Sequence, residues 1–60
     1  LDSPAAVLKM AMGVERDSIA FYVGIKEGVS AKAGKDKVDA IIKEEIGHIA
    51  LLNEKLTALG

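Results

Sequence analysis

Two long segments of the chain carry apolar residues at helical spacing, and one short interruption separates them. In each segment these residues recur every three or four positions, which keeps their side chains on one face of an α-helix. The interruption, EGVSAKAGK, contains Gly28 and Gly34, and both can supply the positive φ of a helix end or a tight turn. The sequence therefore predicts an all-α antiparallel hairpin, with a helix over about 4–28, a turn over about 29–34 and a helix over about 35–59.

The start of the first helix is marked by its capping residues. Asp2 and Ser3 are both residue types that cap helix N-termini. Pro4 suits the first helical position, because its missing N–H would have no partner there. We therefore expect the helix to begin at about Pro4.

Length limits what such a hairpin can do alone. A chain of 60 residues buries only about 60% of its unfolded surface, and it often needs a disulfide, a metal or a partner. Cysteine is absent, so disulfides and thiolate metal sites are excluded. Each predicted helix has an apolar stripe wide enough to contact more than one neighbour. We therefore expect a four-helix bundle of two hairpins, formed by a homodimer or by a related hairpin of a longer protein.

Charge and hydropathy exclude several classes of partner. The chain has 8 Lys and Arg against 9 Asp and Glu, and no basic stripe, so nucleic acid is not expected as a partner. The apolar runs are too short to span a bilayer, and no signal-peptide pattern opens the chain. These features predict a cytoplasmic protein without a membrane partner. Because the chain starts without Met, we also expect a piece of a longer polypeptide or a processed product.

Four polar residues interrupt the apolar stripes. Glu15 and Tyr22 lie in a row with apolar residues of the first helix, and Glu45 and His48 do so in the second. A buried carboxylate without a partner is unfavourable, so these positions require an explanation. Glu15 comes 16 residues before Ala31, while Glu45 and His48 come 14 and 17 residues after it. At 1.5 Å per residue these positions are roughly 24, 21 and 26 Å from the turn, so the three side chains should meet at one level.

This set of side chains points to a metal site. Glu45 and His48 are three residues apart and can address the same ion from one helix. Carboxylates with an imidazole suit iron or manganese, and zinc is an alternative. One hairpin supplies too few ligands for a two-metal centre. Two hairpins would supply four Glu and two His. The four negative charges of the carboxylates would balance two divalent ions.

The residues also carry a family resemblance. The segments LKMAMGVERDSIAFYVGI and IIKEEIGHIALLNEKL resemble the second helical hairpin of the rubrerythrin branch of the ferritin-like superfamily. The resemblance implies that residues 1–60 form half of a ferritin-like domain with two iron ions per assembled bundle. It further implies that Glu15 is a bridging or terminal carboxylate, Glu45 a bridging carboxylate and His48 a terminal ligand. Tyr22 would hydrogen-bond a ligand carboxylate.

The resemblance implies an oxidoreductase of peroxidase or ferroxidase type. Its chemistry would involve O₂, peroxide or ferrous iron, with an electron-donor protein as a partner. The chain departs from the family in lacking the first hairpin and the cysteine-rich rubredoxin module. Three alternatives stay open: a metal-free structural dimer, an inactive truncated fragment, and iron storage in a larger assembly. Among single residues, His48 alone would suit a hydrogen-bonded core histidine, Tyr22 suits plain core packing equally well, and Glu44 is expected in solvent.

Overall fold

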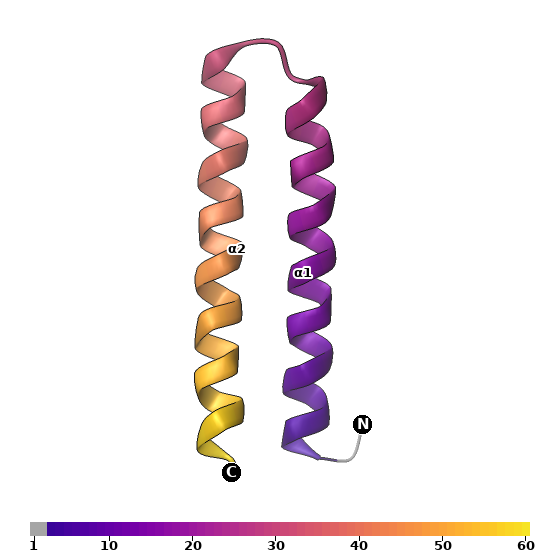
Figure 1. The fold of residues 1–60 in the computed structure, drawn as a ribbon, viewed down its shortest axis with the longest axis vertical. Helices are drawn as coiled ribbons and strands as arrows, with labels where there is room; N and C mark the ends of the chain where they lie inside the picture. The colour runs from indigo at the N-terminus through magenta and orange to yellow at the C-terminus, as the bar shows by residue number, and fades with distance from the viewer. Residues whose placement is uncertain (1–2) are drawn as a thin grey trace.

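The computed structural model describes residues 3–60, which form an antiparallel hairpin of two helices (Figure 1). Helix α1 spans Pro4–Gly28 and helix α2 spans Lys32–Ala58. They lie side by side along their length, and the hairpin measures 44 × 17 × 9 Å. The prediction of an all-α hairpin is confirmed, since the described residues contain no strand.

Helix α1 begins where its capping residues predict. The Ser3 hydroxyl accepts a hydrogen bond from the Ala6 N–H at 3.1 Å, and Pro4 occupies the first helical position. The cap satisfies one of the N–H groups that have no partner within the helix. Asp2, the other expected capping residue, lies outside the described residues.

The connection is shorter than the sequence pattern indicates. Three residues, 29–31, join the helices, and α2 begins at Lys32 instead of the expected position 35. Val29 leaves α1 in an extended conformation, with φ −90° and ψ 125°. Gly28 and Gly34 therefore do not supply a positive φ, and Gly60 is the only described residue that has one. Gly34 lies within the first turn of α2 for a different reason: a Cβ there would be 2.7 Å from Val29 Cγ1.

The hairpin has a very small core. Within residues 3–60 only Met12 and Val38 are buried, with 7% and 9% of their surface exposed. Large apolar side chains such as Val14 and Phe21 are more than 60% exposed. Neither helix, within the same residues, has a stretch long and apolar enough to cross a membrane. The two helices thus leave much of their apolar surface uncovered.

Candidate metal centre

Glu15, Glu45 and His48 come together at one level of the hairpin. Glu15 projects from α1, while Glu45 and His48 project from successive turns of α2. Each side chain offers one ligand atom, and these atoms lie within 4.8 Å of one another. His48 Nδ1 is 3.6 Å from Glu15 Oε1, which is too long for a hydrogen bond. The predicted meeting of the three residues across the hairpin is confirmed.

The cluster is open on one side. The Glu15 side chain is 23% exposed and the His48 side chain is 58% exposed. Glu15 Oε2 is inaccessible to solvent and has no hydrogen-bond partner. His48 is therefore not a core histidine in the single hairpin, and it is less buried than its place among apolar residues predicts. The unpaired Glu15 oxygen is unfavourable, because burial removes its water without providing a replacement.

The two carboxylates alter each other's protonation. The adjacent Glu15 carboxyl group, which favours the protonated form of Glu45, is the main factor that raises the pKa of Glu45 above its ordinary value of 4.5, followed by burial and by repulsion from the Glu15 charge. His48 and the Ser18 hydroxyl act in the opposite direction. Two carboxyl groups this close favour retention of a proton between them, and a bound cation would relieve the same repulsion.

Ser18 is a site residue that the sequence pattern did not identify. Its hydroxyl acts on the Glu45 carboxylate in favour of the charged form and so lowers the pKa of that group. Ser18 comes three residues after Glu15, so both lie on the same side of α1. That spacing is the signal that could have found it, although serine at such a position is common on helix surfaces.

Tyr22 lies two helical turns from Glu15, toward the connection, and is partly buried. Its ring packs edge-on against Phe21, with centroids 5.5 Å apart and an interplanar angle of 73°. In the part of the chain that the structure describes, its hydroxyl makes no hydrogen bond. Contact between Tyr22 and a ligand carboxylate therefore stays a prediction.

The geometry of the cluster suits a divalent transition-metal ion. Ligand atoms about 2.1 Å from one ion are separated by at most about 4.2 Å. The 3.6 Å between His48 Nδ1 and Glu15 Oε1 falls within this limit. Ligand atoms of the cluster that are as far apart as 4.8 Å would need only a small side-chain rotation to reach the same ion. The two carboxylates together balance the charge of one divalent ion.

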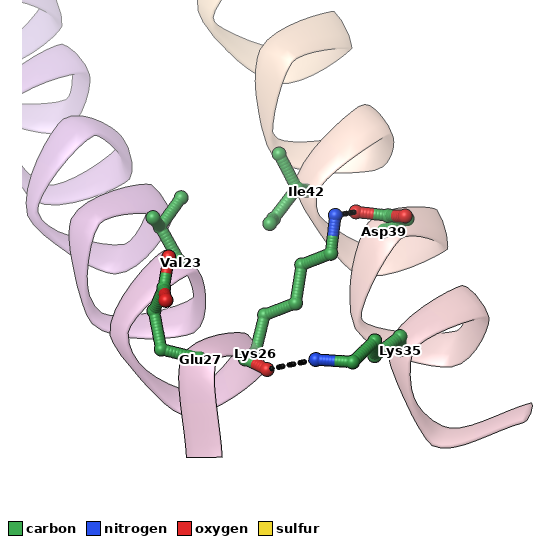
Figure 2. Close-up of a pocket in the computed structure, with 6 residues that line it drawn as sticks. All are labelled: Val23, Lys26, Glu27, Lys35, Asp39 and Ile42. Atoms are coloured by element: carbon green, nitrogen blue, oxygen red, sulfur yellow. Dashed lines mark hydrogen bonds and ion pairs between the residues drawn. The ribbon is translucent and has the colours of Figure 1, made fainter. Parts of the chain in front are cut away.

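A depression lies near the connection, lined by residues of both helices (Figure 2). Three of its four charged side chains have partners: Lys26 Nζ is 2.7 Å from Asp39 Oδ1, and Lys35 Nζ donates to the Lys26 carbonyl at 3.0 Å. These contacts join α1 to α2, and Asp39 is the main cause of a raised pKa at Lys26. The depression therefore has a structural explanation, and the three-residue cluster is the better candidate for function.

Comparison of the chain with protein-family models, curated proteins and solved structures found no match. The resemblance to rubrerythrins accordingly stays a prediction that rests on the residues themselves.

Proposed function

We propose that this chain is half of a carboxylate-bridged di-iron protein of the ferritin-like class. One observation carries the proposal: Glu15 Oε2 is buried without a hydrogen-bond partner, beside a second carboxylate and an imidazole. A cation bound among the three side chains would supply the interaction that this oxygen lacks. It would also reduce the repulsion that raises the pKa of Glu45.

The donor set favours iron over other common ions. Calcium and magnesium prefer oxygen ligands alone, whereas His48 contributes a nitrogen. Structural zinc sites prefer thiolates and several imidazoles, and this chain has no cysteine and a single histidine. Iron and manganese accept carboxylates together with an imidazole, so manganese is the closest alternative.

A single hairpin provides half of the ligands. Glu15, Glu45 and His48 would supply three ligands, and the exposed side of His48 is where a second hairpin would add its own. A second, equivalent hairpin would bring the total to four carboxylates and two imidazoles, the ligand set of di-iron carboxylate bundles. That hairpin is either a second copy of the chain or a first hairpin of a longer protein.

The proposed activity is redox chemistry at this centre. When bound, two ferrous ions supply two electrons for the reduction of O₂ or peroxide, or are themselves oxidised as the substrate. In this scheme Glu15 and Glu45 hold and neutralise the ions, and His48 completes the set at the open edge. The Ser18 hydroxyl, which lowers the pKa of Glu45, would favour the charged carboxylate that a cation requires. Electrons would come from a separate donor protein, because the chain has no cysteine to hold an iron–sulfur centre.

A metal-free structural dimer is the competing proposal. The exposed apolar side chains, including Val14 and Phe21, favour association whether or not a metal binds. In that case the carboxylates would keep a shared proton and the protein would have no enzymatic activity.

Anaerobic titration with Fe²⁺, followed by metal analysis, tests the proposal. We expect one iron per chain and a higher melting temperature. Binding to the folded state alone raises the free energy of unfolding by about 2.7 kcal/mol when the free Fe²⁺ concentration is a hundred times Kd. Glu15→Ala and Glu45→Ala should both abolish binding. Glu44→Ala is the matched control, because Glu44 is exposed and outside the cluster. Absence of iron with no change in melting temperature would overturn the proposal, as would unchanged binding by Glu45→Ala.

A further inference from the structure

The side of the hairpin that carries Glu15, Glu45 and His48 is defined here as the open face. Helical spacing places Val7 and Ile25 of α1 on it, with Ile41 and Leu52 of α2. Val7 is 47% exposed and Ile25 is 38% exposed. The open face is thus an apolar surface with a polar cluster near the middle of its length.

We infer that the open face binds a second copy of this chain, antiparallel to the first. The two-fold axis crosses the helices at the level of Arg16 on α1 and between Ile46 and Gly47 on α2. The level of the axis rests on the proposed function, because the two half-sites must meet there. The identity and the orientation of the partner rest on the apolar residues.

The apolar residues of α1 are symmetric about this level. In an antiparallel pair of identical helices, residues equally far before and after the axis face each other. Val7 and Ile25 are each nine residues from Arg16. They are also 18 residues, or five full turns, apart and so point in the same direction. Val14 and Ser18 form the next pair inward, in which a small side chain faces a larger one.

Helix α2 shows the same symmetry about the level of the axis. Ile41 and Leu52 are equally distant from the point between Ile46 and Gly47. Glu45 and His48 are likewise equidistant from it, so Glu45 of one copy faces His48 of the other. Each ion would then be bound by both chains. A partner of different sequence would not require this self-complementarity, which is why a second copy is the occupant that the residues favour.

The size of the open face is adequate for a stable dimer. The hairpin is 44 Å long and 17 Å wide. A face with these dimensions covers about 750 Å², close to the roughly 800 Å² per partner of a standard protein interface. Association would also cover apolar surface that a core of Met12 and Val38 leaves exposed.

The first test is the oligomeric state in EDTA, measured by light scattering at about 100 µM chain. We expect a dimer without metal and a tighter dimer with Fe²⁺, because the ions bind both chains. Ile25→Glu should produce monomers by placing a charge in the interface. Val23→Glu is the matched control, because Val23 is 45% exposed on the opposite face, beside Lys26 and Glu27. A monomeric parent chain, or equal effects of the two substitutions, would overturn the inference.

The second test measures orientation with spin labels on Arg16→Cys and Glu27→Cys, in a chain with no other cysteine. Both residues are exposed and outside the cluster. In the antiparallel dimer the two Arg16 labels are level, whereas the two Glu27 labels are separated by about 33 Å along the bundle. If the axis instead ran along the hairpin, both label pairs would be level and their distances similar, which would contradict the proposed arrangement.

These results separate the inference from the proposed function. An antiparallel dimer that binds no iron would support the inference and refute the di-iron centre. One iron bound to each monomeric chain would support a metal site and refute the second copy as its partner.

Discussion

His48 Nδ1 of α2 lies 3.6 Å from Glu15 Oε1 of α1, so polar side chains of the two helices meet at the level of the cluster. The imidazole is 58% exposed, while the glutamate has an inaccessible oxygen without a partner. The pair therefore places a carboxylate with one buried oxygen beside an imidazole at the open edge of the cluster. This arrangement allows each group to be tested separately.

Replacement of the imidazole should weaken metal binding without unfolding the helices. We expect His48→Gln to lower Fe²⁺ affinity by more than about tenfold, since loss of even an indirect contact to a metal ligand costs about that much. Because His48 is more than half exposed, the helical circular dichroism should stay unchanged. Anaerobic calorimetry measures the affinity, with Asn53→Ala as an exposed control on the same helix. Equal affinity in His48→Gln and the parent would exclude His48 as a ligand.

The pKa of Glu45 predicts a particular pH dependence of stability in the metal-free protein. Its pKa is raised in the folded state, so between 4.5 and that higher value the folded protein holds more protons than the unfolded one. The free energy of unfolding therefore falls as pH rises through this interval, and the penalty is constant above it. Glu45→Gln should remove this loss. Urea denaturation of both proteins from pH 4 to 8 measures the difference, and parallel curves would contradict the shift.

The close contact of Gly34 with Val29 predicts opposite effects for two glycine substitutions. Gly24→Ala should stabilise the hairpin by about 1 kcal/mol, because alanine has the higher helix propensity and its Cβ meets no atom within 4 Å. Gly34→Ala should instead destabilise it by about 1 kcal/mol or more, since a Cβ would lie 2.7 Å from Val29 Cγ1.

Thermal unfolding measures both glycine variants. The double variant Val29→Ala with Gly34→Ala should recover much of the loss, because it removes the opposing methyl group. If Gly34→Ala were as stabilising as Gly24→Ala, the tight contact would not exist in solution.

The helix N-termini predict a second contrast. Ser3→Ala removes the hydroxyl that accepts from the Ala6 N–H and should cost about 1 kcal/mol. Ala31 precedes α2 with an extended backbone, φ −79° and ψ 134°, but provides no side-chain cap. Ala31→Ser should therefore add a similar amount. Each change corresponds to about 4–8 °C in melting temperature for a chain of this size. An unchanged melting temperature in Ala31→Ser would mean that solvent already hydrogen-bonds the free N–H groups of the first turn of α2.

Much of the candidate site could be predicted because helices have a constant rise and a constant rotation per residue. Counting from the turn placed Glu15, Glu45 and His48 at one level, and they lie together in the structure. The same count did not locate the start of α2, because Gly34 resembles a turn residue and its real role depends on contact with Val29. Ser18 was missed for a related reason, since its role appears only once Glu45 is placed opposite it.

The sequence by itself determined the two helices, their antiparallel order and the three side chains that share a level, because these follow from local periodicity and chain length. Only the tertiary structure decided that Glu15 Oε2 is buried without a partner, that His48 is exposed, and that the open face has so little of its apolar surface covered. These properties depend on the distance and rotation between the two helices. Packing of side chains across the hairpin sets both, and no repeat within one helix contains that information.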